Sequence, residues 1–101
     1  MLQPFFRSNN NYLLTTVAGE HVVVPIVNSI AKLANVISIN EIGLAVFQGM
    51  ERGLAPDDIA AELNDNYEFP DGFDLDGHVR QFVGRMLQHG FFTQTDDDAA
   101  H

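Results

Sequence analysis

Runs of β-prone residues occupy much of the first half of the chain, whereas apolar residues recur at helical spacing in the second half. One β-prone run covers residues 12–17, and a second covers residues 21–27. Three residues that include Gly19 separate the two runs, which predicts a hairpin. Pro25 cannot donate a ladder hydrogen bond, so we expect its part of the second strand to lie at a sheet edge or a strand end.

A third strand is predicted over Val36, Ile37, Ser38 and Ile39, because β-branched residues dominate this segment. Residues 28–35 before it are too few to stand alone as a helix, so we expect them to form a connection. The third strand carries no Lys or Pro of the kind that blunts an exposed edge. An exposed edge of this kind can accept an extended peptide as an added strand. If the strand is instead central, its apolar residues are simply core, and the sequence leaves both readings open.

Three helices are predicted after the strands, each with its own boundary signals. The expected starts are Asn40, Pro56 and Asp74, and the expected ends of the first and third helices are Gly53 and Gly90. Asn and Asp cap helix N-termini, Pro fits a first helical position, and Gly commonly follows a helix end. Phe91 and Phe92 then either add a short strand or plug the core.

The third helix carries an apolar stripe with a mixed flank beside it. The stripe consists of Leu75, Val79, Phe82, Val83 and Met86, and the flank of Asp76, Arg80, Gly84 and Leu87. In the flank, Arg80 can pair with an acidic residue of a partner, and Gly84 can allow another backbone to approach closely. Both can equally be ordinary solvent-facing residues.

These elements predict an α+β domain in which a three-stranded antiparallel sheet is followed by three helices, an order typical of a winged-helix-like fold. Residues 1–11 are expected to form a flexible N-terminal arm, because they are polar around Asn9 and show no periodicity. Residues 12–92 form the predicted domain, and residues 93–101 an acidic C-terminal tail.

Charge and composition narrow the possible functions. Five Lys and Arg stand against 14 Asp and Glu, for a net charge of −9, which disfavours nucleic acids and anionic membranes as partners. The chain has no cysteine, which excludes disulfides and cysteine-ligated metals. No apolar run approaches a membrane span, and the N-terminus does not resemble a secretory signal, so a cytoplasmic location is expected.

No group of residues is spaced for catalysis. The glycines are scattered rather than gathered in a phosphate-binding loop, and no serine lies in a nucleophile-elbow pattern. The histidines have no paired ligand spacing; they are His21, His78, His89 and His101. We therefore expect a protein that is not an enzyme and that binds neither a cofactor nor a metal.

Several segments of the chain, in order, resemble one known family. They are Val-Val-Val-Pro at residues 22–25, Asn-Val-Ile-Ser-Ile-Asn-Glu-Ile-Gly at 35–43, Met-Glu-Arg-Gly-Leu-Ala-Pro-Asp-Asp-Ile-Ala-Ala-Glu-Leu at 50–63, His-Val-Arg-Gln-Phe-Val at 78–83, and Gly-Phe-Phe at 90–92. Together they resemble PqqD-like proteins over about residues 12–92.

The resemblance implies a recognition element for ribosomally made, enzymatically modified peptides. In that family the leader of a precursor peptide adds as a strand to the third strand of the sheet, in the groove beside the third helix. A separate enzyme, often a radical-SAM protein, carries out the modification. Carried over here, the peptide-binding positions are Val36, Ile37, Ser38 and Ile39 on the strand and Val79, Arg80, Val83 and Leu87 on the helix.

Departures from the family pattern argue against pyrroloquinoline quinone synthesis as the pathway. They are His78 where an acidic residue is common, Ala55 where a Ser or Thr cap is common, and Phe91 where Trp is typical.

Two functions of other classes remain as alternatives. A winged-helix nucleic-acid-binding protein would need basic residues along the third helix, which has only Arg80 and Arg85, about 140° apart. A scaffold domain would self-associate through a strand edge, which makes a homodimer possible.

Overall fold

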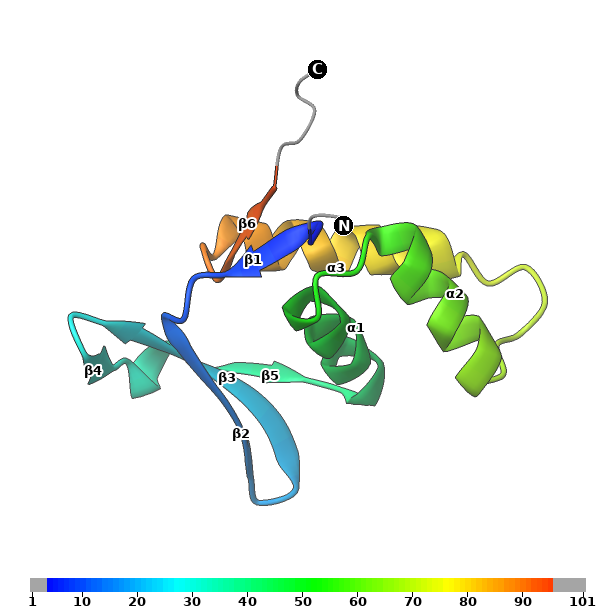
Figure 1. Cartoon of the computed structure of the whole chain (residues 1–101). Helices are drawn as coiled ribbons and strands as arrows, with labels where there is room; N and C mark the ends of the chain where they lie inside the picture. The colour runs from blue at the N-terminus through cyan, green and yellow to red at the C-terminus, as the bar shows by residue number, and fades with distance from the viewer. Residues whose placement is uncertain (1–3, 96–101) are drawn as a thin grey trace.

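The computed structural model describes residues 4–95, which form an α+β domain with the helices on one side of a small antiparallel sheet. Figure 1 shows the sheet and its hairpins below, helix α1 directly above the sheet, and helix α3 running across the top with α2 beside it. The α+β fold class, with an antiparallel sheet followed by three helices, is confirmed. The sheet has four strands rather than the expected three, and a second, two-stranded sheet is present.

The sheet is built around β3 (Glu20–Val27), which pairs with β2 (Tyr12–Val17) along one side. Ala18 and Gly19 connect the two strands with φ of 53° and 83°. Two central residues with positive φ are the mark of the type I′ turn, whose twist suits a hairpin. The predicted hairpin is therefore confirmed, with a two-residue connection rather than a three-residue one.

The other side of β3 pairs with two short strands in succession. The end of β3 pairs with β4 (Ile30–Ala31), and its beginning pairs with β5 (Ile37–Ile39). The 3-10 helix η1 (Leu33–Asn35) joins β4 to β5. The expected connection over residues 28–35 thus contains a second small hairpin, and the third strand begins at Ile37 rather than at Val36. Pro25 lies near the end of β3, as its missing N–H predicts.

The three helices begin and end where the local signals place them. They are α1 (Glu41–Glu51), α2 (Pro56–Asn66) and α3 (Leu75–Gln88). Asn40 and Asp74 cap α1 and α3, because their side chains accept hydrogen bonds from the backbone N–H groups of Gly43 and Gly77 at 2.8 and 3.0 Å. Within residues 4–95, no helix combines the length and the apolar character that crossing a membrane requires.

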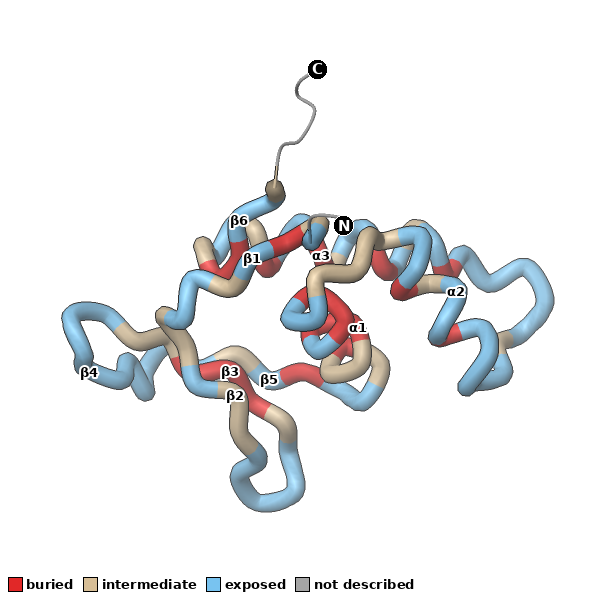
Figure 2. Tube along the Cα trace, viewed as in Figure 1, coloured by how far each residue is buried: buried red, intermediate tan, exposed pale blue. Residues whose placement is uncertain are grey.

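The core lies where α1 and α3 meet the inner face of the sheet, and Figure 2 shows the buried residues gathered there. Phe47 of α1 is at its centre, with its ring edge-on to Tyr12 at 5.0 Å and to Phe92 at 5.1 Å. Edge-to-face packing of this kind adds stability beyond the burial of apolar area. Phe91 and Phe92 are both buried, and Phe92 also begins a strand, so both proposed roles for this pair are realised.

The flexible arm expected over residues 1–11 is wrong for the part that the structure describes. Phe6–Ser8 form β1, which pairs antiparallel with β6 (Phe92–Gln94), and the Phe6 side chain is only 2% exposed. A three-residue strand is too short to show an alternating pattern, and burial of Phe6 supplies the stability. The predicted domain boundaries at residues 12 and 92 therefore move outward, so that the domain includes β1 and all of β6. The acidic residues 96–98 of the expected tail lie outside the described residues.

Candidate functional site

Strand β5 is an edge of the sheet. It pairs with β3 on one side, and no other strand within residues 4–95 pairs with its second side. This resolves the two readings that the sequence left open: the third strand is at the edge. An edge strand carries N–H and C=O groups that can pair with a further extended segment.

The hydrogen-bond alternation shows which backbone groups of β5 point outward. The backbone N–H of Ile26 donates to the carbonyl of Asn11 in β2's direction, whereas the N–H of Lys32 donates to the carbonyl of Pro25. The backbone N–H and C=O groups of even-numbered β3 residues therefore point toward β2, and those of odd-numbered β3 residues point toward β4 and β5. His21 and Val23 therefore exchange hydrogen bonds with their partners Ile39 and Ile37. The N–H and C=O of Ser38, which lies between these partners, are directed away from the sheet.

An open cleft of about 410 Å³ lies between β5 and α3. We call it the β5–α3 cleft. Its lining residues are Ser38, Ile39, Asn40, Ile42, Gly43, Val46, Phe69, Phe73, Leu75, His78, Val79, Gln81, Phe82 and Arg85. Because the cleft adjoins the free edge of β5, an added strand there would place alternate side chains into it.

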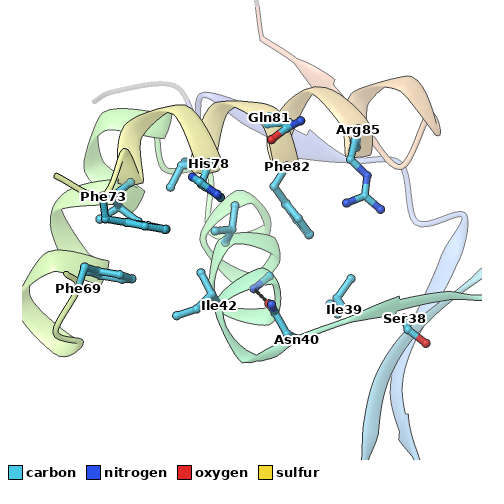
Figure 3. Close-up of a pocket in the computed structure, with 14 residues that line it drawn as sticks. Ser38, Ile39, Asn40, Ile42, Phe69, Phe73, His78, Gln81, Phe82 and Arg85 are labelled. Atoms are coloured by element: carbon cyan, nitrogen blue, oxygen red, sulfur yellow. Dashed lines mark hydrogen bonds between the residues drawn. The ribbon is translucent and has the colours of Figure 1, made fainter. Parts of the chain in front are cut away.

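Helix α3 presents four residues to the cleft beside the buried Val79. They are His78, Gln81, Phe82 and Arg85, and Leu75, at the start of α3, also lines the cleft from a buried position. Figure 3 shows Phe82 and Arg85 reaching from α3 toward β5. The floor is close-packed under Phe82: a Cβ placed on Gly43 would lie 3.0 Å from Cε2 of Phe82 and 3.2 Å from Cβ of Ile39. Gly43 thus lets α1 pass close beneath the cleft.

One end of the β5–α3 cleft is aromatic. The rings of Phe69 and Phe73 stack with centroids 5.3 Å apart, and Phe73 stacks on His78 at 4.5 Å. His78 is held in place through its Nδ1 atom, which lies 2.8 Å from the backbone carbonyl oxygen of Asp74. Phe73 remains 39% exposed, so this end offers an accessible apolar surface.

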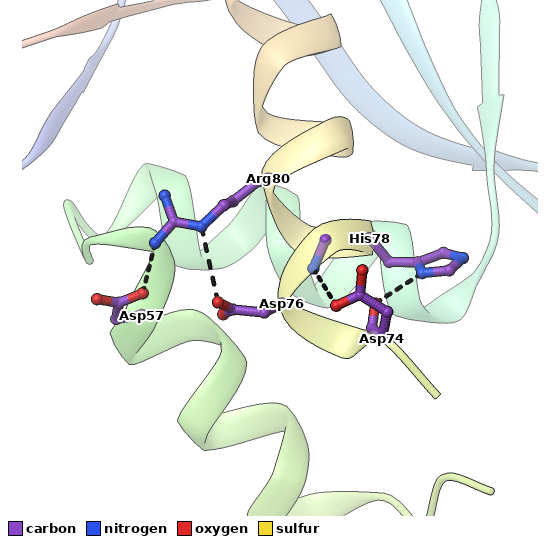
Figure 4. Close-up of polar contacts among 6 residues, drawn as sticks. Asp57, Asp74, Asp76, His78 and Arg80 are labelled. Atoms are coloured by element: carbon purple, nitrogen blue, oxygen red, sulfur yellow. Dashed lines mark hydrogen bonds and ion pairs between the residues drawn. The ribbon is translucent and has the colours of Figure 1, made fainter. Parts of the chain in front are cut away.

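Arg80 lies on another side of α3. Its Nη2 atom donates to Asp57 of α2 at 2.7 Å, and its Nε atom lies 3.7 Å from Asp76. Figure 4 shows Arg80 turned toward α2 while His78 projects from the opposite side of α3. Arg80 is therefore an α2–α3 bridging residue and does not line the cleft.

Of the eight residues expected to bind a peptide, the cleft lining includes Ser38, Ile39 and Val79. Ile37 is half-buried on the inner face, and Val36 precedes β5 and is 44% exposed. Val83 is buried in the core and Leu87 packs against it, so these two do not line the cleft. The rotation of α3 assumed from the sequence therefore differs from that in the structure, although the binding roles themselves stay predictions.

The sequence carried a signal for the side of α3 that lines the cleft. The apolar stripe has two flanks, and the large aromatic Phe82 lies toward the flank of His78 and Arg85 rather than toward Arg80. Phe69 and Phe73 come from the α2–α3 loop, where nothing in the local pattern predicts that they line this cleft. The lining positions missing from the predicted set are Asn40, Ile42, Gly43, Val46, Phe69, Phe73, Leu75, His78, Gln81, Phe82 and Arg85.

The arrangement suits the binding of an extended chain. The lining combines apolar side chains with a free strand edge, and residues 4–95 contain no cluster of three or more His, Cys, Asp or Glu placed to hold a metal ion. Peptide recognition by strand addition uses this combination of backbone hydrogen bonds and side-chain pockets.

No protein-family model matches the chain, and no curated protein matches it significantly. Solved structures do share its fold. One is lasso peptide synthetase B1 complexed with the leader peptide, at a TM-score of 0.67 and 17% identity over 88% of this chain and 98% of that one. Another is TbiB1 in complex with the TbiA(beta) leader peptide, at a TM-score of 0.64 and 12% identity over 85% of this chain and 93% of that one. The chain thus has the fold of these leader-bound proteins.

Proposed function

We propose that this protein captures the leader of a ribosomally made precursor peptide and presents it to a separate modifying enzyme. The leader adds as a strand to the free edge of β5, and its alternate side chains enter the β5–α3 cleft. The observation that carries the proposal is the outward-facing backbone of Ser38 at the rim of this cleft. The two fold relatives, each in complex with a leader peptide, support it.

The protein itself is non-catalytic in this proposal. The chemistry belongs to a partner such as a radical-SAM enzyme, as the PqqD-like resemblance implies, and the pair works in the cytoplasm. The domain contributes affinity and position, because holding the leader raises the concentration of the attached substrate segment at the enzyme.

Nucleic-acid binding is disfavoured by the placement of the basic residues of α3. Arg80 is engaged with two carboxylates of α2 and α3, and Arg85 lies on the cleft side of the helix. A recognition helix needs its basic residues on one exposed face to contact phosphates.

Self-association is compatible with the geometry, because β2 pairs only with β3 within residues 4–95 and so offers a second free edge. A homodimer through β2 leaves the β5 edge available to a peptide. Light scattering with and without bound peptide separates the two edges: a β2 dimer persists when peptide binds, whereas a β5 dimer dissociates.

The test is fluorescence anisotropy of labelled leader peptides from short reading frames encoded beside this gene, titrated with the protein. We expect saturable binding by one leader and competition by its unlabelled form. Failure of every such leader to bind a folded sample would overturn the proposal.

A further inference from the structure

The charge of the β5–α3 cleft is opposite to that of the protein. Asp and Glu account for 14 residues of the chain, yet none of the residues that line the cleft is acidic. Arg85 and His78 are the basic residues of the lining. Salt screens charges beyond about 10 Å, so the charges nearest the cleft act most strongly on a side chain bound inside it. At the β5 end, the Ser38 hydroxyl donates to the carboxylate of Glu20 at 3.4 Å, which leaves Arg85 as the charged side chain of the lining itself.

Arg85 is available to a ligand. The other two arginines of the helical region form ion pairs, Arg52 with Glu62 at 2.6 Å and Arg80 with Asp57 at 2.7 Å. Arg85 makes no ion pair within residues 4–95, and Figure 3 shows its guanidinium directed toward β5. A guanidinium matches the geometry of a carboxylate, with which it forms paired, charge-assisted hydrogen bonds.

The spacing of the cleft residues fixes a pattern in the bound strand. His78 at the aromatic end and Arg85 are seven positions apart on α3, a rise of roughly 10 Å. Side chains on one face of a strand recur every two residues, or about 6.7 Å. Two side chains of an added strand that lie two or four residues apart in the peptide therefore reach the two ends of the cleft.

We propose that the β5–α3 cleft selects peptides that carry an Asp or Glu opposite Arg85, with a large apolar side chain two or four residues away at the aromatic end. This inference rests on the proposed function, because it concerns the peptide held at the same edge. It names the chemical class of the recognised segment, which strand addition alone leaves open.

The test is selection of a displayed library of random 12-residue peptides on the immobilised protein, followed by sequencing. The same selection is run on Arg85→Gln, on Arg85→Lys and on Arg80→Gln, a matched control that removes an arginine from the same helix outside the cleft. We expect one enriched position to be acidic, with an apolar position at the stated spacing. The acidic preference disappears with Arg85→Gln and persists with Arg85→Lys and Arg80→Gln.

A selected peptide and its Asp→Asn or Glu→Gln form are then compared by anisotropy. We expect the amide form to bind the wild type about tenfold more weakly, and Arg85→Gln to bind both forms alike. Enriched peptides that lose binding when the β5 edge is blocked, yet show no acidic position, would overturn this inference and leave the proposed function standing. Absence of any enriched peptide would overturn both.

Discussion

The guanidinium of Arg80 lies 2.7 Å from the carboxylate of Asp57, so the first turn of α2 holds this side chain away from the β5–α3 cleft. The pair is exposed, with 56% of the Arg80 side chain accessible. We predict that Arg80→Gln lowers the free energy of unfolding by less than about 1 kcal/mol, the usual range for exposed ion pairs. Peptide affinity should stay unchanged. Denaturant unfolding and anisotropy check the two parts, and a large loss of affinity would place Arg80 in the binding site after all.

Proline substitutions in β5 should separate peptide binding from folding. The N–H of Ser38 points away from the sheet, so Ser38→Pro removes a donor that only an added strand would use. We expect the variant to fold and to bind a leader at least about tenfold more weakly, which is the value of one hydrogen bond whose partner is left unsatisfied.

Ile37→Pro is the matched comparison, because the N–H of Ile37 faces β3. It should reduce the free energy of unfolding by about 1–3 kcal/mol through loss of a buried ladder bond. Equal unfolding curves for the two variants, measured in urea, would contradict the assignment of outward and inward groups, and a larger loss of stability in Ser38→Pro would mean that it is reversed.

A methyl group at Gly43 should narrow the cleft. Its Cβ would lie 3.0 Å from the ring of Phe82 and 3.2 Å from Ile39, so the ring must move. We predict that Gly43→Ala weakens peptide binding and costs about 1 kcal/mol of stability, in the range for overpacking.

Gly84→Ala is the control for that substitution. Gly84 lies in the same helix as Phe82, is exposed, and has no atom within 4 Å of the position its Cβ would take. Ala should stabilise α3 by about 1 kcal/mol, from helix propensity, without changing peptide affinity. Thermal unfolding and anisotropy measure both effects; a gain in affinity with Gly84→Ala would show that this face of α3 also contacts peptide.

Tyr12 should make the fold sensitive to high pH. Its pKa is raised to about 12, mainly by burial; the Ser8 hydroxyl lowers the pKa, and the carboxylate of Glu51, 2.9 Å from the Tyr12 hydroxyl, raises it. The unfolded value is about 10. A raised folded pKa means that the stabilisation is fully present below pH about 10 and is lost as the pH rises from about 10 to about 12.

Denaturant unfolding across this pH range should therefore show falling stability in the wild type and a flatter profile in Tyr12→Phe. Tyr67, on the exposed α2–α3 connection, supplies the control through Tyr67→Phe. A wild-type profile that matches Tyr12→Phe throughout would contradict the raised pKa.

Local signals in the sequence predicted the elements well. Asn40 and Asp74 cap helices through bonds to the backbone three residues on, and Gly53 and Gly90 end them with positive φ. Each such signal depends on neighbouring residues alone, so it can be interpreted without knowing the fold.

Features that depend on distant residues were predicted poorly. Strand β1 forms because Phe6 meets a partner strand near residue 94, and no local pattern encodes that encounter. The helical period fixed which residues of α3 are buried, but either flank of the buried stripe could have faced β5. The ion pair of Arg80 with Asp57 and the place of Phe82 decide between the flanks, and both require the packed structure.

The pairing of Phe6 with Gln94 brings the two ends of the described chain together, and neither β1 nor β6 contributes a residue to the cleft lining. A domain with adjacent ends can be spliced into a surface loop of another protein with little distortion of either. This fold is therefore suited to insertion into other proteins. Grafted into an unrelated host enzyme, it would leave the edge of β5 open. A substrate fused to a peptide that binds at β5 would then be held close to that enzyme.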